Sequence, residues 1–595
     1  MKKITLLALS SVTLLISAGP CLASSDSEQL HHVVDEYTAA YKRLDAFQAP
    51  TYNVEELLNQ FGDYPSPAYY DRNKKLLVTT TEKLKAIHAD ALQGKDKVLY
   101  RLISEDVAVS LEGFKYPREL LDFNQMSNRL HAYIDDSSQD LTTFPFDNVK
   151  HYDDFVKRSQ GFPAYIDAEI ELLRRGIKEK VVLSCTVAER TPNSFKDGLE
   201  ADVQKNPFFR PISFMPKDFS DSDKKRLTEE YTTMVRDRIV PGFQKFDHFF
   251  KTEYIPHCRK NAYGMGDLPN GKAWYKYEIL NQTNLAMDPK EIHELGLKEV
   301  ARISKEMEEI KNELGYKGPL KDFLKSLTSD PKYFFTPAKD MFGAFQNIKT
   351  VTATKIPQYF KLIPKGDFTI VETSNPEDAA GSYNAPTEYV PHGKFVVNTK
   401  NLRSVPLYDV TTLMLHETIP GHHFQLALQF EEKDLLTEYQ RKIFNSNSFV
   451  EGWALYCEYL GNEMGMYKDP MQRLGNRDDE MLRAVRLVVD TGIHAYGWSR
   501  KKAVAYMTDH IASDAGDISN ESNRYSVWPG QALGYKLGQL KIIELRKLAE
   551  KELGSKFDIR DFHSRVIGDG TLSLGVLEAQ IKDWIAEVSK KSALN

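Results

Sequence analysis

A Pro-Gly pair interrupts a group of histidines in the segment His416-Glu417-Thr418-Ile419-Pro420-Gly421-His422-His423. In the ordinary H-E-x-x-H motif of zinc hydrolases, two histidines one helical turn apart bind one metal and the glutamate acts as a general base. Here the second histidine comes two residues late. Pro420 cannot continue a regular helix, because its ring clashes with the carbonyl of His416 and its nitrogen donates no hydrogen bond. We therefore expect one helix to end here and another to begin.

The spacing of the histidines supports such a break. In an unbroken helix His422 would lie about 9 Å along the axis from His416 and about 120° around it, and His423 about 10.5 Å along the axis. Neither spacing suits a shared metal. Gly421 tolerates the backbone angles of a bulge, so the insertion can loop out and return a histidine toward His416. Either His422 or His423 satisfies this argument, and surface or capping histidines are the alternative without a metal.

Glu451 is the best candidate for a third ligand. A catalytic zinc takes three protein ligands and leaves a position for water. Glu451 lies near the start of an apolar helical segment, between Phe449 and Trp453, and Glu458 shares its helix face seven residues later. A carboxylate among apolar and aromatic side chains needs a hydrogen-bond partner, a counter-charge or a metal. Glu458 is the alternative third ligand, and a solvated charge is the alternative for both.

The chain as a whole is predicted to be mainly α-helical. Its 595 residues are 27% charged and 41% hydrophobic, which is enough to build a large core. Apolar residues recur at helical spacing in residues 166–177, 292–314 and 532–553. Strand patterns are short and occur in residues 181–183, 368–372 and 394–398. We expect residues 24–595 to form one helical unit, divided at most into lobes of about 28–250 and 251–595.

The elements around the histidines have a definite expected order. Residues 394–398 form a strand, and Ser404 then caps a helix with Pro406 in its first turn. That helix delivers His416 and Glu417. A second helix runs from about His422 to residue 432, and a third carries Glu451.

The first 23 residues are typical of an export signal. Lys2 and Lys3 precede an apolar run from Ile4 to Ala18, and Ala23 offers a small residue for cleavage. The run is too short for a convincing membrane span. We expect soluble export to the periplasm or beyond, because residues 18–20 make a poor lipobox for lipid attachment at Cys21.

Charge and cysteine usage narrow the function further. The formal net charge is −6 with no basic block, which argues against a nucleic-acid partner. Beyond the leader, only Cys185, Cys258 and Cys457 occur. Three scattered thiols are no disulfide framework, so we expect buried free thiols, with one bridge as the alternative.

Three motifs in order resemble a known family. They are residues 416–425, Glu451-Gly452-Trp453-Ala454-Leu455-Tyr456, and Pro529-Gly530-Gln531-Ala532-Leu533-Gly534-Tyr535-Lys536. The combination resembles the bacterial family catalogued as "domain of unknown function" number 885. That family is similar to the helical gluzincin peptidases: carboxypeptidase Taq, the thimet oligopeptidases and angiotensin-converting enzyme. Their H-E-x-G-H motif aligns here when Ile419-Pro420 is treated as an insertion, and the resemblance then assigns His416, His422 and Glu451 to Zn²⁺.

The resemblance also implies a fold and roles for other residues. The fold would be a large helical zincin-like peptidase with a cleft and a small β element beside the active-site helix. Glu417 would be the general base, and the oxyanion donor would come from Tyr525, Tyr535 or His494. Residues 394–398 would bind a peptide substrate by strand addition. Leu455 stands where many gluzincins carry an acidic residue that orients a histidine, so that partner must come from elsewhere.

Two arginines could bind substrate or could form ion pairs within the protein. Arg483 and Arg486 can receive a substrate carboxylate bidentately or pair with the nearby acids at positions 478, 479 and 480, and the pairing is the favoured reading.

The expected function is an exported zinc metallopeptidase acting on short peptides. One alternative is a binding protein with a structural or inactive zinc site, against which Glu417 argues because such a site needs no general base. A zinc hydrolase of a non-peptide amide or ester is the other alternative.

Overall fold

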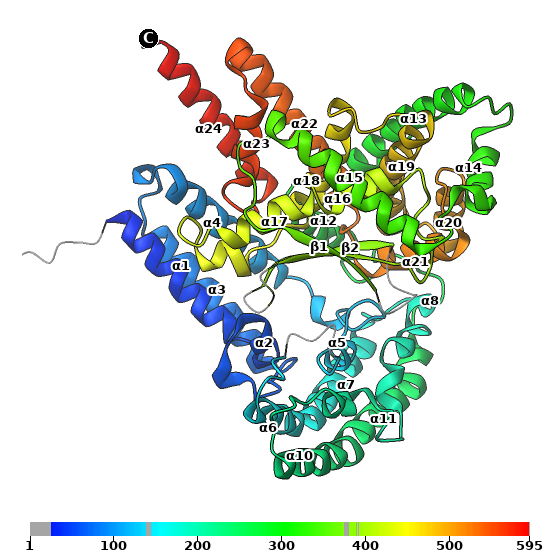
Figure 1. Cartoon of the computed structure of the whole chain (residues 1–595). Coiled ribbons are helices and arrows are strands. Elements are labelled where there is room, and N and C mark those ends of the chain that lie inside the picture. Colours follow the sequence, from blue (N-terminus) through cyan, green and yellow to red (C-terminus); the bar gives the residue numbers. More distant parts are fainter. Residues whose placement is uncertain (1–24, 139–143, 374–379, 388–389, 391, 594–595) are drawn as a thin grey trace, which may run out of the picture.

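The computed structural model describes residues 25–138, 144–373, 380–387, 390 and 392–593. The expected leader and Cys21 lie outside the described residues. The chain is mainly α-helical, as expected, with one small sheet near its middle (Figure 1). Within the described ranges, no helix combines the length and apolarity that crossing a membrane requires.

The helices fall into two groups along the chain. The first group is α1 (Asp26–Lys42), α2 (Ala49–Tyr52), α3 (Pro67–Lys85), α4 (Gly94–Gly113), α5 (Arg129–Asp135), α6 (Val149–Arg158), α7 (Phe162–Glu179), α8 (Cys185–Ala188), α9 (Arg210–Ser213), α10 (Asp221–Met234) and α11 (Val240–Phe249). The second group is α12 (Gly271–Thr283), α13 (Pro289–Glu313), α14 (Leu320–Ser329), α15 (Ala338–Tyr359), α16 (Val410–Glu417), α17 (His422–Glu431), α18 (Asn447–Glu463), α19 (Pro470–His494), α20 (Arg500–Thr508), α21 (Ala515–Val527), α22 (Leu533–Leu553), α23 (Ile559–Ile567) and α24 (Leu574–Ala593).

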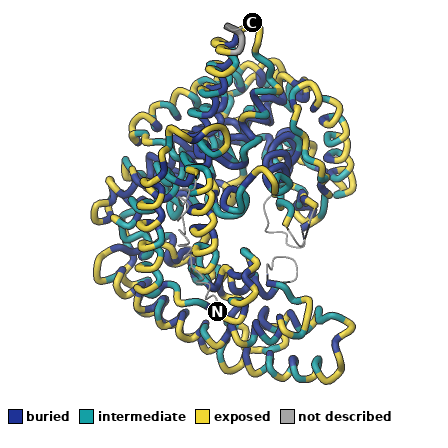
Figure 2. The backbone as a smooth tube through the Cα atoms, turned by 90° about the vertical axis from the view of Figure 1, so that its left-hand side faces the viewer, coloured by how far each residue is buried: buried dark blue, intermediate teal, exposed yellow. Residues whose placement is uncertain are grey.

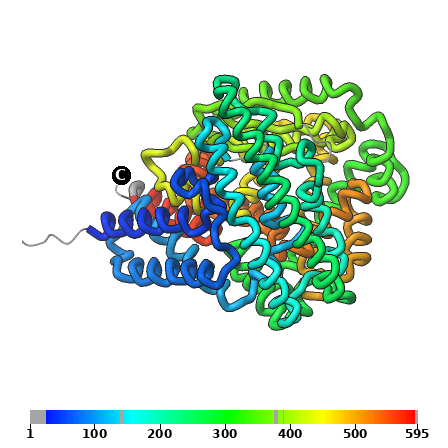
Figure 3. Tube along the Cα trace, turned by 90° about the horizontal axis from the view of Figure 1, so that it is seen from below, coloured from blue at the N-terminus to red at the C-terminus, as the bar shows by residue number. Residues whose placement is uncertain are grey.

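The hydrophobic cores do not follow the chain order. One core joins α1, α3 and α4 to α17, α18 and α22–α24, and Figure 3 shows the N-terminal helices beside these later segments. A second core holds α5–α7, α10 and α11. Figure 2 shows buried residues, in dark blue, in the upper and in the lower part of the view. The hydrophobic core therefore does not divide near residue 250, because α1, α3 and α4 share a core with helices from the C-terminal part of the chain.

A three-stranded sheet contains β1 (Phe368–Glu372), β2 (Gly381–Asn384) and β3 (Gly393–Val397) in the order β1-β3-β2. β1 pairs parallel to β3, with Phe368 opposite Gly393, and β2 pairs antiparallel to β3. Phe395 is buried with its ring centre 5.0 Å from that of Phe345 on α15, and α16 joins the same core. The sheet is thus fixed beside the helix that carries His416.

Two strand expectations need correction. Residues 181–183 form no strand, although Ser184 makes an isolated bridge with Arg259. β3 occupies nearly the expected 394–398, but it is the central strand with both sides paired. A substrate cannot add to it, and among the described residues the free edges belong to β1 and β2.

The start of α16 also differs from expectation. The helix begins at Val410 after Asp409, and the Ser404 hydroxyl donates to the carbonyl of Asn401 at 2.7 Å instead of capping a helix. The Asn398 side chain accepts hydrogen bonds from the backbone of Lys400 and Asn401. The hydroxyl of Ser404, which the sequence pattern assigned to a cap, is thus used in a local turn.

Close packing of α18 against α22 joins the second and third motifs. A Cβ on Gly452 would meet the Cα of Gly538 at 2.5 Å, and one on Gly538 would collide with the carbonyl oxygen of Ser448. Glycine at both positions lets the two backbones approach. The helix that carries Glu451 is therefore seated directly on the helix that carries Tyr535.

Cys185 and Cys258 form a disulfide, with their Cα atoms 4.9 Å apart. The expectation of free thiols was wrong for this pair and correct for Cys457, which is free and buried. The bridge between Ser184 and Arg259 aligns the neighbouring residues, and the Cys185 nitrogen donates to the Arg259 carbonyl at 3.1 Å. A separation of 73 residues hides this pairing in the sequence.

Replacing Cys185 by Ser should lower the free energy of unfolding by about 4 kcal/mol, because a bridge closing a loop of this length restricts the unfolded chain by about that amount. Urea unfolding without reductant measures the loss. A reductant should destabilise the wild type similarly and leave Cys185→Ser unchanged. Equal stability of variant and wild type without reductant would show that the bridge contributes nothing.

Candidate metal centre

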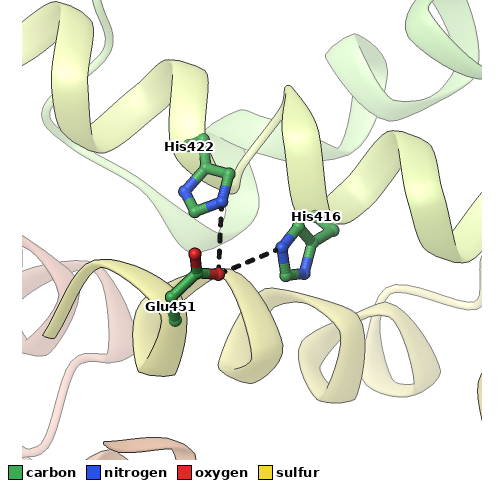
Figure 4. A group of neighbouring side chains, drawn as sticks. All are labelled: His416, His422 and Glu451. Carbon is green, nitrogen blue, oxygen red and sulfur yellow. Dashed lines mark ion pairs between the residues drawn. The ribbon is translucent and has the colours of Figure 1, made fainter. Parts of the chain in front are cut away.

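The Pro-Gly insertion forms a tight connection between α16 and α17. α16 ends at Glu417 and α17 begins at His422, and the peptide bond between Ile419 and Pro420 is cis. A Cβ on Gly421 would collide with the carbonyl oxygens of Leu415 and His416. Only glycine allows the chain to pass this close to the end of α16, and the turn returns His422 to the level of His416 (Figure 4).

α18 holds this turn in place. The Pro420 carbonyl accepts hydrogen bonds from the indole Nε1 of Trp453 at 3.0 Å and from the Sγ of Cys457 at 3.4 Å. Both donors are buried on the helix that carries Glu451. The insertion and the third candidate ligand are thus fixed relative to each other, a role for Trp453 that its apolar sequence context did not reveal.

The three expected ligands come together (Figure 4). The Nε2 atoms of His416 and His422 lie 3.5 and 3.6 Å from the same Oε2 of Glu451. The two imidazole rings are nearly perpendicular, with centres 4.8 Å apart. One metal-binding atom from each residue lies within 4.8 Å of the others.

This arrangement fits a zinc ion. Ligand atoms about 2.1 Å from a tetrahedral zinc lie about 3.4 Å from one another, close to the two distances to Glu451. Oε2 of Glu451, which both Nε2 atoms face, is buried without a hydrogen-bond partner, which is costly unless something else satisfies it. Two imidazoles and one carboxylate are a donor set of catalytic zinc sites.

Glu458 orients His416 and is not positioned as a ligand. Its Oε1 lies 2.6 Å from Nδ1 of His416, so Nε2 is the nitrogen left to face Glu451. Arg483 lies 3.6 Å from the same Oε1 and also pairs with Asp479. A carboxylate on the far nitrogen fixes the tautomer and direction of a metal-binding histidine. The partner missing at Leu455 is therefore found two helical turns after Glu451, on the face that the sequence indicated.

The charges of the site favour a cation. Burial alone would lower the pKa of His416, but the neighbouring carboxylates of Glu451 and Glu458 raise that pKa to about 10. Burial opposes ionisation of Glu451 as well, yet the two histidines hold its pKa well below the usual range. The proton held by His416 supplies positive charge that a metal ion would replace.

His423 faces away from this group. Its Nδ1 lies 2.8 Å from the hydroxyl of Tyr383 on β2, and its ring centre lies 4.8 Å from that of Phe368 on β1. Burial lowers its pKa to about 4. The sequence did not decide which of the two histidines is the second ligand. The geometry places His422 in the candidate metal site, which we call the metal group, with His416 and Glu451, and places His423 in contact with the sheet.

Two of the three expected oxyanion donors are already engaged. His494 is buried with Nδ1 accepting from the Met265 nitrogen at 3.1 Å and Nε2 lying 2.9 Å from the Tyr525 carbonyl. The Tyr525 hydroxyl donates to Glu521 at 2.7 Å and accepts from Arg486 at 3.1 Å. Both side chains are structural, because their polar atoms have partners within the core.

Tyr535 is the remaining donor. It is partly buried, and burial together with the negative charge of Glu451 raises its pKa. Its ring centre lies 4.2 Å from the guanidinium carbon of Arg486. Glu417 is also partly buried and directly follows His416.

The expected arginine pairs are formed only in part. Arg483 pairs with Asp479 as expected. Arg486 pairs instead with Glu521, 2.9 Å away, because it points toward α21.

Comparisons with known proteins identify the family. The family model described as "Bacterial protein of unknown function (DUF885)" matches residues 49–581. A presumed lipoprotein from Colwellia psychrerythraea has 25% sequence identity and a TM-score of 0.88, over 95% of this chain and 100% of that one. A presumed lipoprotein of unknown function from Shewanella oneidensis has 17% identity and a TM-score of 0.70, over 94% and 99% of the two chains, and shares the fold. The chain belongs to this bacterial family.

One curated protein, the ATP-dependent DNA helicase Hel308 of Pyrococcus abyssi, is 20% identical over 285 residues. The match covers 44% of this chain and spans 37% of the helicase. At this identity and coverage the likeness carries no function to this chain.

Glu458→Gln should weaken zinc binding about 10- to 100-fold, because the amide no longer holds the imidazole of His416 as a carboxylate does. Competition with a fluorescent chelator measures the affinity. Glu463→Gln is the matched control, since Glu463 lies on the same helix but pairs with Arg546 at 2.8 Å. Equal zinc affinities of the two variants would show that Glu458 does not support zinc binding.

Proposed function

For this member of a family of unknown function, we propose an exported zinc metallopeptidase that hydrolyses short peptides. The observation that carries the proposal is the convergence of two imidazole nitrogens on one oxygen of Glu451. That oxygen is buried and has no hydrogen-bond partner. His416, His422 and Glu451 would hold the ion.

The metal would supply Lewis-acid polarisation of the scissile carbonyl and a lowered pKa for the attacking water. Glu417 would accept the proton of that water and pass it to the leaving amine. It precedes the turn and is not one of the three metal-binding residues. Tyr535 would donate a hydrogen bond to the developing oxyanion, because it is the one of the three candidate donors that is close enough to Glu451 to feel its charge.

The free edge of β2 is the candidate docking place for a peptide backbone. β2 is paired on one side only among the described residues, and it contacts α16. Its Tyr383 touches His423, the neighbour of the metal-binding His422. An extended peptide adding to this edge would gain backbone hydrogen bonds close to the metal group.

Two alternatives stay distinct from this proposal. Glu417 disfavours a purely structural zinc, because such a site has no use for a general base. A zinc hydrolase of a non-peptide amide or ester would use the same three ligands, and the free strand edge favours the peptide.

Export is supported by the leader at residues 1–23 and by two structural relatives described as presumed lipoproteins. Lipid attachment at Cys21 is the alternative to soluble export.

Glu417→Gln should keep folding and zinc content but lower peptide hydrolysis by roughly 10²–10⁴-fold, because glutamine has the same shape and cannot accept the proton. Glu451→Gln should lose zinc and activity together. Metal analysis and a peptide-library digest read by mass spectrometry measure both effects. Near-wild-type hydrolysis by Glu417→Gln contradicts the mechanism, and no cleavage by the zinc-loaded wild type favours the alternatives.

A further inference from the structure

An acidic hollow lies in the N-terminal half of the chain and is lined in part by α5 and α7. Its volume is about 250 Å³, and the residues that define it here are Tyr64, Asp122, Arg129, Tyr165 and Glu169. At about 30 Å³ for each water, it has room for roughly eight waters or a small organic group. None of its lining residues belongs to the metal group.

The positive charges near the hollow already have partners. Arg129 pairs with Asp45 at 2.5 Å, and its guanidinium carbon lies 4.2 Å from the ring centre of Tyr64. Arg118 pairs with Glu278 at 3.0 Å. Asp122 and Glu169 have no ion-pair partner within the part of the chain that the structure describes. Asp122 and Glu169 therefore face the hollow without an ion pair of their own, because the cations whose charge reaches them, Arg118 and Arg129, pair with Glu278 and Asp45.

The inner wall of the hollow carries two buried polar side chains, Glu169 and Tyr165, which interact with each other. Glu169 is only 2% exposed, and burial raises its pKa to about 8 despite the opposing charge of Arg129. The Tyr165 hydroxyl on the same wall is buried without a hydrogen bond of normal geometry. Burying such groups costs free energy that a bound partner would recover. Asp122, by contrast, is exposed and lies at the rim.

We propose that the acidic hollow binds an organic cation, an alkylammonium or guanidinium group, between Asp122 and Glu169 and against the tyrosine rings. Ammonium and guanidinium groups form charge-assisted hydrogen bonds with carboxylates and are attracted to aromatic faces. Arg129 shows the same chemistry within the protein itself. A bare divalent ion fits less well, because two carboxylates and aromatic walls do not supply the six or more oxygens that calcium takes.

The hollow adjoins a cavity that residues of the C-terminal half of the chain also line. A neighbouring cavity of about 120 Å³ shares Asp122 and Ser127 with it and is also lined by Trp528 and Pro529. Pro529 begins the motif that leads into α22 and Tyr535. A ligand held by its cationic end at Glu169 would thus extend toward the third motif. Binding of the cation does not require the metal, so this inference is tested separately from the proposed function.

Calorimetric titration of the metal-free protein with n-butylammonium and with agmatine tests the site. Both cations should bind, and the neutral isostere n-butanol should not. Asp122→Asn and Glu169→Gln should each weaken binding about tenfold or more, the usual effect of losing one hydrogen bond to a charged group. Glu309→Gln, an exposed carboxylate on α13, is the matched control and should bind as the wild type does.

Proton release provides a second measurement. Glu169, which faces Asp122, Arg129 and Tyr165, is mainly protonated at pH 7 because its pKa is about 8. A bound cation lowers that pKa, so binding should release protons, seen as a dependence of the heat on the buffer. The release should vanish in Glu169→Gln.

Two results overturn the proposal: no binding of either cation at millimolar concentration, or equal binding by the wild type and both variants. Tighter binding of a lysine-containing peptide than of butylammonium supports the site and assigns the cation to a peptide. Tighter binding of the free amines supports the site and assigns the cation to a small molecule.

Discussion

The carboxylate of Glu451, whose Oε2 is buried between two imidazoles, is the constraint on which the rest of the site depends. A buried carboxylate oxygen requires positive charge near it, which a metal ion shared with His416 and His422 would supply. Both histidines must therefore be held within a few ångströms of one helix. The turn at Pro420 and Gly421, the support from Trp453 and the carboxylate of Glu458 all serve this purpose.

The three sequence motifs form one physical unit. The first supplies two ligands and the turn, and the second supplies the third ligand and the indole that binds the turn. The third motif supplies Tyr535 and leads into α22, where Gly538 packs against Gly452 of α18. Their order in the sequence is thus the order of three helices packed in succession: α16–α17, α18 and α22.

Much of this unit could be predicted from the sequence, because its chemistry is local. The clash of Pro420 with a helical carbonyl predicts the break, and a glutamate among aromatic residues predicts a partner. The sequence also placed Glu458 on the face of Glu451, although only the structure shows that it binds the far nitrogen of His416. Choosing between His422 and His423 requires the direction of each ring, which depends on the sheet and Tyr383. Long-range contacts such as the disulfide and the backbone contacts of His494 leave no periodic signal in the sequence, and β2 is too short to give one.

A crystal structure of the zinc-loaded protein, with anomalous data collected above the zinc edge, tests the central claim most directly. The account predicts one strong peak about 2.0–2.2 Å from Nε2 of His416, Nε2 of His422 and the carboxylate of Glu451, with Glu458 still hydrogen-bonded to Nδ1 of His416. A peak bound by His423 or Glu458 in place of these ligands, or no peak at this site in zinc-saturated crystals, would contradict it.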